Sequence, residues 1–277
     1  MRRTICLWLL TTAIFSLFLL QEILAEEKKE ISGSAILGIY NQYIFRGYEI
    51  GKNGLVLQPS LSLGTHGFSF SLWGNLDTNQ RSTKTATFDK EYTKGWNETD
   101  LSLSYTYAPK KLSLTVGYTY YSTKYANDTE EIFLSFSYKT LFNPTFSVYR
   151  DITSYIGTYM NLGFSHSLSL SNGITMDLSS AFGYFLGESD YWRTYDKATF
   201  SYTGRKYRGF HDGMIKVSLS IPLGKVLSIQ PSIQYWFPLS GKAKKEYPSG
   251  GSIKDSYNPN GPVKYNFVYG ALITCSF

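Results

Sequence analysis

The sequence has few charged residues and almost no cysteine. Charged residues make up 17% of its 277 residues, against roughly 25% in ordinary soluble domains. Of the two cysteines, Cys6 lies in an N-terminal targeting segment, so Cys275 is the one thiol of the remaining chain and an internal disulfide framework is excluded. The three histidines stand far apart and no CxxC pair occurs, so the sequence indicates no metal site and no cofactor.

A long apolar run is also missing from most of the chain. Beyond Ala25 no apolar stretch reaches the about 18 residues that a transmembrane helix needs. Residues 1–25 begin with two arginines, continue with an apolar run and end at a plausible cleavage site, as a secretory signal peptide does. We therefore expect 1–25 to be a signal peptide and 26–277 to form one domain, with an uncleaved N-terminal anchor as the alternative.

Aromatic and hydroxyl side chains, by contrast, are abundant, and they alternate. The chain holds 24 Tyr and 18 Phe, and segments such as LSLSYTY (101–107) place apolar side chains at every second position. Serine and threonine occupy most of the positions between them. This period, repeated over segments of about ten residues, is typical of transmembrane β-strands with one face toward lipid and one toward the lumen.

The pattern predicts an all-β fold, a single closed antiparallel transmembrane β-barrel. We expect twelve strands, starting near residues 33, 54, 68, 98, 111, 131, 143, 156, 174, 213, 226 and 263. Short links alternate with longer ones, as the periplasmic turns and extracellular loops of an outer-membrane barrel do. The predicted localisation is the bacterial outer membrane of a Gram-negative cell. A secreted β-sandwich is the alternative, but the regular strand length and the aromatic strand ends favour the barrel.

The C-terminal strand carries the most regular alternation. Tyr269, Ile273 and Phe277 belong to its apolar face, and the chain ends on the last of them. A closed barrel must pair its last strand with its first, because an open edge in lipid leaves backbone groups unsatisfied. The segment resembles the C-terminal signal that outer-membrane proteins present to the barrel-assembly machinery, so this machinery is an expected partner.

A second resemblance lies near the start of the domain. The segments IYNQYIFRGYEI and GLVLQPSLSLGTHGFSFSLWGNLD resemble the opening of the TorF-like outer-membrane porin family. The matching residues are Tyr43, Phe45, Arg46, Gly47, Gln58, Pro59, Trp73 and Gly74. The family tends to have Pro-Ala before the glutamine, and this sequence has Leu55, Val56 and Leu57 there instead. The resemblance implies fold and localisation and supplies no functional site.

The predicted lumen is lined by small hydroxyl side chains with few charges, which favours a water-filled path. The predicted pore-lining residues are Arg46, Asp77, Asp100, Glu131, Asp177, Lys216, Gln230, Gln234 and Lys264. Charges of mixed sign on a pore wall sort solutes by charge. The predicted function is therefore a porin-like channel for passive diffusion of small hydrophilic solutes. These charges could instead pair with one another and merely complete the wall.

Two alternative functions remain open. One is a structural or adhesive barrel without a conducting pore. The other is a barrel enzyme, such as one acting on lipids, and it finds little support, so we predict no catalytic residues. His166 with Ser171, Asn172 and Gly173 has the wrong spacing for an outer-membrane phospholipase. The protease candidates Glu188, Asp190, His211 and Asp212 all flank one predicted loop.

The long loops carry basic and aromatic residues together. Arg205, Lys206 and Arg208 lie among aromatics, and Lys242 and Lys244 follow in the next long loop. On the outside of a barrel, such residues favour anionic lipopolysaccharide or an anionic solute over nucleic acid as a partner. Outer-membrane lipids and lipopolysaccharide are therefore expected partners, although solvated loops without any ligand are the simpler interpretation.

Overall fold

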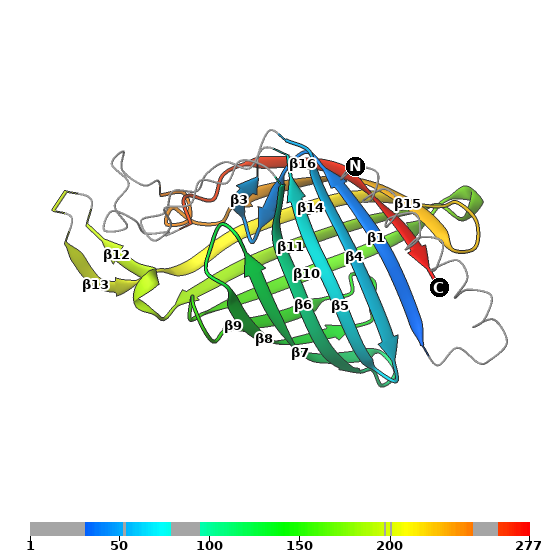
Figure 1. Ribbon diagram of the computed structural model, residues 1–277, viewed down its shortest axis with the longest axis horizontal. Helices are drawn as coiled ribbons and strands as arrows, with labels where there is room; N and C mark the ends of the chain where they lie inside the picture. Colours follow the sequence, from blue (N-terminus) through cyan, green and yellow to red (C-terminus); the bar gives the residue numbers. More distant parts are fainter. Residues whose placement is uncertain (1–30, 52–53, 79–94, 197, 200, 246–259) are drawn as a thin grey trace, which may run out of the picture.

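The chain forms a closed barrel of twelve antiparallel strands in the computed structural model (Figure 1). The structure describes residues 31–51, 54–78, 95–196, 198–199, 201–245 and 260–277. The barrel strands are β1 (Ser32–Tyr40), β4 (Val56–Thr65), β5 (Phe68–Asp77), β6 (Gly95–Tyr107), β7 (Leu112–Thr123), β8 (Thr129–Tyr138), β9 (Thr145–Asp151), β10 (Gly157–Ser169), β11 (Thr175–Gly187), β14 (Arg208–Pro222), β15 (Leu227–Pro238) and β16 (Asn266–Ser276). The predicted barrel is confirmed. Its predicted strand starts lie within three residues of the observed ones, except that the strand expected near residue 213 begins at Arg208.

The remaining elements lie in the links between barrel strands. They are β2 (Tyr43–Phe45), β3 (Tyr48–Gly51), β12 (Arg193–Tyr195), β13 (Tyr202–Lys206) and the short 3₁₀ helices η1 (Ser171–Gly173) and η2 (Asp190–Trp192). The hairpin β12–β13 projects beyond the barrel at the left of Figure 1. Within the described residues, no helix is long and apolar enough to cross a membrane. The predicted signal peptide, 1–25, lies outside the described residues.

The first and last strands close the ring. Gly33 and Phe277 exchange two backbone hydrogen bonds of 2.8 and 2.9 Å at the end of the β1–β16 ladder. The Phe277 ring lies over Gly33, where an added Cβ atom would come within 2.4 Å of it. Ile273 pairs with Leu37 further along the same ladder. The pairing predicted from the C-terminal alternation is therefore present.

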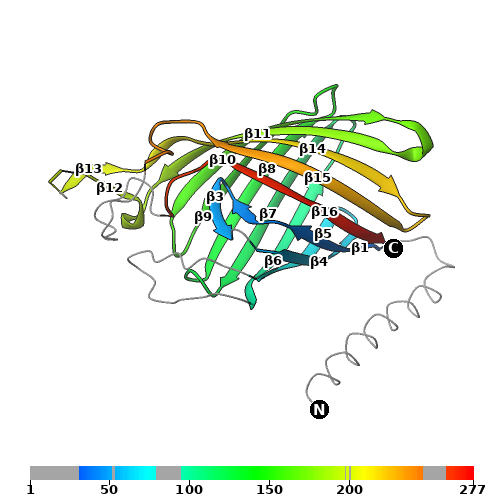
Figure 2. The same ribbon diagram turned by 90° about the horizontal axis from the view of Figure 1, so that it is seen from above.

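The two ends of the barrel differ in their connections, as Figure 2 shows. At one end, called here the turn end, consecutive strands are joined by tight turns, and the described chain begins and ends there. His66 and Gly67 form one such turn with φ angles of 49° and 87°, the left-handed pair of a type I′ hairpin. At the other end, called here the loop end, the links include 41–55, 188–207 and 239–265.

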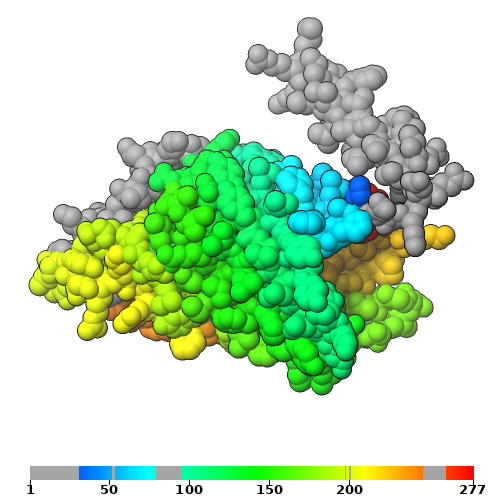
Figure 3. All heavy atoms as spheres, turned by 90° about the horizontal axis from the view of Figure 1, so that it is seen from below, coloured from blue at the N-terminus to red at the C-terminus, as the bar shows by residue number. Residues whose placement is uncertain are grey.

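The outer face of the barrel is apolar and the inner face is polar. Leu103, Val116 and Leu134 are about half exposed on the outside, at 56%, 54% and 49%, although they belong to regular strands. Between them on the same strands, inward serines and threonines pair across neighbouring strands. Ser102 and Thr119 are one such pair, 2.8 Å apart. Figure 3 shows the continuous outer surface that β5–β9 present. An apolar exterior around a polar interior suits a barrel surrounded by lipid.

Candidate functional site: the constricted end of the lumen

The link between β1 and β4 folds into the lumen as the small hairpin β2–β3. Its two-residue turn consists of Arg46 and Gly47, with φ angles of 48° and 78°, which is again the left-handed pair of a type I′ turn. The turn residues contact β8, β10 and β14, on walls several strands away from β1 and β4. The hairpin therefore crosses the loop end of the lumen and narrows it.

Arg46 anchors the tip of this hairpin to the opposite wall. Its guanidinium donates two hydrogen bonds of 2.7 Å to the Glu131 carboxylate, and Tyr121 donates a third to the same carboxylate at 2.9 Å. The rings of Phe45, Tyr149 and Tyr159 surround the guanidinium carbon at 4.6–4.8 Å. Burial lowers the pKa of Arg46, but the adjacent Glu131 carboxylate outweighs this, so the pKa of Arg46 is raised. The carboxylate of Glu131 thus binds the charge of the guanidinium through hydrogen bonds, and the aromatic rings bind the cation through cation–π contacts.

A second set of contacts packs the side of the hairpin. Tyr48, Ala243 and Val263 form a buried apolar cluster in which each side chain is at most 4% exposed. Next to Tyr48, the His211 ring is fully buried and its Nδ1 atom lies 2.6 Å from the Tyr207 hydroxyl. These contacts join the hairpin to β14 and to the link between β15 and β16.

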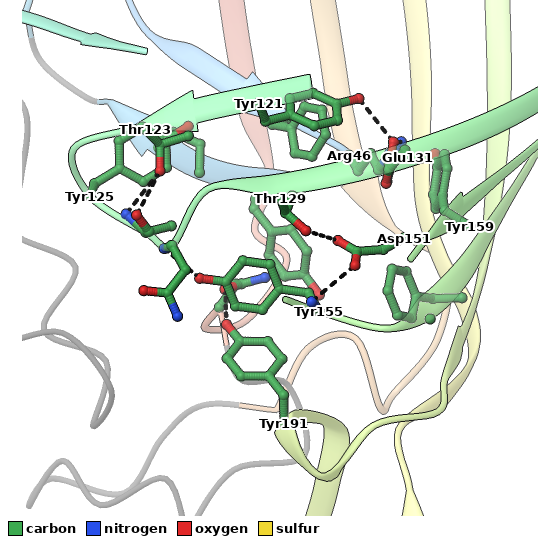
Figure 4. Close-up of a pocket in the computed structure, with 18 of the residues that line it drawn as sticks. Arg46, Tyr121, Thr123, Tyr125, Thr129, Glu131, Asp151, Tyr155, Tyr159 and Tyr191 are labelled. Carbon is green, nitrogen blue, oxygen red and sulfur yellow. Dashed lines mark hydrogen bonds and ion pairs between the residues drawn. The ribbon is translucent and has the colours of Figure 1, made fainter. Parts of the chain in front are cut away.

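A cavity of about 140 Å³ lies between the hairpin tip and the loop-end wall (Figure 4). Nine of the 20 residues that line it are aromatic. The rings of Tyr121, Tyr125, Tyr155, Tyr191 and Trp192 face it from the ends of β7, from two short loops and from η2. The Tyr155 and Tyr191 rings pack in a tilted arrangement with ring centroids 4.6 Å apart, and the backbone carbonyl of Tyr155 accepts a 3.0 Å hydrogen bond from the Trp192 indole.

Three carboxylates and one guanidinium line this cavity among the described residues. They are Glu98, Glu131, Asp151 and Arg46. Glu98 accepts a 2.6 Å hydrogen bond from Tyr125. Burial raises the pKa of the Tyr125 phenol well above its usual range, which keeps this hydroxyl a donor. Asp151 accepts from Thr129 at 2.6 Å and from two backbone amides.

The structure places most of the predicted pore-lining residues on the inner wall. Asp77, Asp100 and Glu131 lie at the loop end, where Asp77 rests against Gly51 of the hairpin. Within the described residues, Asp100 Oδ1 is buried without a hydrogen-bond partner. Arg46 lies in the lumen too, but in the hairpin turn and not on a wall strand, because the chain leaves the barrel after Tyr40.

The predicted residues nearer the turn end form a separate polar group. Asp177 accepts hydrogen bonds from Ser167, Ser220 and Gln230 at 2.6, 2.8 and 3.3 Å. Lys216 is half-buried on β14 and pairs across the sheet with Gln234. Lys264 differs from the prediction, since it is exposed and precedes β16, which begins only at Asn266.

The residues considered for catalysis do not converge. Glu188 pairs with Arg150 and Asp190 with Arg193, while Asp212 accepts a hydrogen bond from Tyr159 inside the lumen. At the turn end, His166 Nδ1 lies 2.7 Å from the Leu141 carbonyl oxygen, near the short helix η1. The part of the chain that the structure describes contains no group of three or more His, Cys, Asp or Glu residues able to hold a metal ion.

Sequence analysis missed the inward hairpin and the aromatic cavity. In the segment 41–55, the Arg46–Gly47 pair between the short runs YIF (43–45) and YEI (48–50) is a local signal of a tight turn. The cavity residues come from separate elements and have no common motif. Several aromatic side chains at the loop ends of consecutive strands are the one sequence signal that points to them.

Comparison with solved structures identifies the architecture. The NanC porin matches with a TM-score of 0.51 and 8% sequence identity, over 88% of this chain and 98% of that chain. The COG4313 outer membrane channel from Pseudomonas putida F1 matches with a TM-score of 0.51 and 11% identity, over 89% and 94%. No protein-family profile and no curated protein matches the sequence, so the resemblance to the TorF-like family stays a prediction. The fold is that of outer-membrane β-barrel channels.

Proposed function

We propose that this chain is a channel of the bacterial outer membrane through which small hydrophilic solutes diffuse passively, with the hairpin β2–β3 as its constriction. The change in the inner wall along the barrel carries this proposal. Toward the turn end, inward hydroxyls such as Ser104 and Ser135 are partly reached by solvent. At the loop end, inward side chains such as Asp77 and Glu131 are buried, with exposures of 0% and 5%. A polar vestibule thus leads to one narrow zone.

The charges of the lumen favour cations. Inward carboxylates among the described residues are Asp77, Glu98, Asp100, Glu131, Asp151, Asp177 and Asp212, and the inward cations are Arg46 and Lys216. Arg46 is already neutralised by Glu131. The other inward acids outnumber Lys216, and each of them that is ionised raises the local concentration of cations in a narrow passage and repels anions.

A barrel without a conducting pore is the second candidate, and the packing of the hairpin favours it. Tyr48 is 4% exposed and Val263 is 2% exposed, which is the burial of a domain core. A hairpin held this firmly could close the lumen altogether. The two candidates differ in whether ions pass while the hairpin is in place.

Conductance in a planar bilayer tests the proposal. The refolded chain should give stable, ohmic steps in potassium chloride, and its reversal potential in a salt gradient should show cation selectivity. The double variant Arg46→Ala/Glu131→Ala should give larger steps, because it frees the hairpin without leaving one buried charge unpaired. Arg193→Ala/Asp190→Ala, which removes an exposed ion pair outside the lumen, is the matched control.

The outcomes separate the two candidates. Steps in the wild-type chain support the channel, and silence until the hairpin is freed supports a closed barrel. Silence of both proteins, with a β spectrum and heat-modifiable migration retained, overturns the channel.

A further inference from the structure

We propose that the aromatic cavity at the loop end binds a compact organic cation of the guanidinium or quaternary ammonium class. Only the idea that this cation is also a solute of the channel rests on the proposed function. Binding of the cation to the cavity can be measured without any transport. The cavity, its walls and its charges each support this class.

The walls suit a cation without a large hydration shell. The space is lined by the rings of Tyr121, Tyr125, Tyr155, Tyr191 and Trp192. Phe185 also lines it and packs against Trp192 with ring centroids 4.2 Å apart. Ring faces carry negative electrostatic potential, so they attract an organic cation while tolerating its apolar groups. A small inorganic ion would lose its water there and gain few oxygen ligands.

The protein itself already binds one such cation at the edge of the cavity. The Arg46 guanidinium lies 4.6–4.8 Å from three ring centroids and is paired with Glu131 in a two-pronged arrangement. This internal example shows that aromatic faces and carboxylates at this level of the lumen can hold a planar cation together. The adjacent empty space has the same two kinds of wall.

The cavity has more acidic side chains than Arg46 alone can neutralise, so a second cation can be accommodated. Arg46 is neutralised by Glu131, so Glu98 and Asp151 remain as carboxylates lining the cavity. Asp100 adds a further carboxylate beside it. It lies within electrostatic reach of Glu98 and Glu131, and its strand position pairs with Tyr121. A bound cation would stabilise the ionised forms of these buried acids, whereas an anion would oppose their ionisation.

The volume sets the size of the ligand. The cavity measures about 140 Å³. An engineered protein cavity of about 150 Å³ accommodates a benzene molecule. A trimethylammonium head or a guanidinium group therefore fits inside it.

Choline and its neutral isostere 3,3-dimethylbutan-1-ol provide the direct test. Each is titrated into the refolded chain in detergent, with isothermal titration calorimetry as the main readout and tryptophan fluorescence from Trp192 as the second. Choline should bind at least about tenfold more tightly than the neutral isostere. Glu98→Gln, which keeps an acceptor for Tyr125, should weaken choline binding about tenfold or more.

Asp196→Asn is the matched control, because it removes one partly exposed carboxylate at the start of the link between β12 and β13. It should leave choline affinity unchanged. Trp192→Phe should retain binding by calorimetry and lose most of the fluorescence change, which places the ligand in this cavity. Tyr155→Leu supplies a second variant, should Glu98→Gln fail to refold, and should also weaken binding.

Equal affinity for choline and the neutral isostere would overturn the proposal. An equal loss of choline affinity in Glu98→Gln and in Asp196→Asn would overturn it too. Conductance measured on the same preparation separates the two proposals. If the protein binds choline but does not conduct, the channel proposal is wrong and the binding-site proposal stands. If the protein conducts ohmically but does not bind choline, the binding-site proposal is wrong and the channel proposal stands.

Discussion

Arg46 and Glu131 are 85 residues apart in the sequence and meet across the lumen through two hydrogen bonds of 2.7 Å. The arginine comes from the link between the first two barrel strands, and the glutamate from β8 on a distant wall. The guanidinium side chain is 13% exposed and the carboxylate 6%. The pair therefore helps to fix the position of the hairpin β2–β3, and with it the width of the lumen at this level.

Arg46→Ala should destabilise the folded barrel more than Arg46→Ala/Glu131→Ala does. The single substitution leaves the Glu131 carboxylate buried with only Tyr121 as a donor, and breaking such a pair on one side costs about 3–5 kcal/mol. The double variant leaves no buried charge behind. Urea unfolding of the refolded proteins in lipid vesicles measures both changes. Equal stability of the single variant and the wild type would show that the pair does not hold the hairpin.

Gly47→Ala should loosen the hairpin without altering any charge. Gly47 has a φ of 78°, and an added Cβ atom would lie 2.6 Å from the Asp212 side chain and 3.0 Å from Val263. The left-handed backbone alone costs a residue with a side chain roughly 1–2 kcal/mol. In this variant the unfolding midpoint should fall and the single-channel conductance should rise.

Gly241→Ala is the matched control for that substitution. Among the described residues other than its two chain neighbours, no atom lies within 4 Å of a Cβ atom placed there. Its stability should stay within about 0.5 kcal/mol of the wild type. If Gly47→Ala also keeps the stability of the wild type, the turn does not require a glycine at this position.

The apolar outer band gives a prediction about the membrane. Leu103→Arg should destabilise the barrel in lipid by up to about 2–4 kcal/mol, because it places a charge on the lipid face of β6. Leu141→Arg alters an equally exposed leucine, 63% against 56%, but lies in the turn between β8 and β9 and should be nearly neutral. Unfolding in vesicles measures both. Equal tolerance of the two arginines would contradict a lipid-facing band.

Most of the fold could be predicted from the sequence, because barrel strands obey a strict local rule. Each strand has an apolar face toward lipid and a polar face toward the lumen, so its phase can be read from a segment such as 101–107 alone. The same rule placed Asp177 and Gln230 on the inner wall, where they are hydrogen-bonded to each other. It also placed Lys264 inward, although the strand begins only after that residue.

The constriction could not be predicted in this way. No local pattern in segment 41–55 shows that it folds into the lumen, because its contacts there are with residues far along the chain, such as Glu131 and Tyr159. Glu131 was placed on the inner wall, but nothing local indicates that Arg46 is its partner. The aromatic cavity is harder still, since Tyr125, Tyr155 and Trp192 come from three separate links and meet only when the ring has closed.

The contact between the first and last strands gives a further prediction. Phe277→Ala should reduce the fraction of barrel that assembles and migrates as the heat-modifiable form, because the ring covers Gly33 where the first and last strands meet. The substitution removes this cover but keeps both backbone hydrogen bonds between the two residues. Phe142→Ala, at an exposed phenylalanine in the turn between β8 and β9, is the control and should assemble normally.

Gly33→Val tests the same contact from the other strand. A side chain at this position would come within 2.4 Å of the Phe277 ring and push it away, so assembly should fall as it does in Phe277→Ala. Combining the two substitutions should cost less than the sum of the single effects, since residues in contact are not additive. Refolding into vesicles measures the intrinsic effect, and the amount of barrel in the outer membrane of cells measures assembly. A defect of Phe277→Ala in cells but not in vesicles would assign the terminal ring to recognition by the assembly machinery, whereas equal defects in both would assign it to closure of the barrel itself.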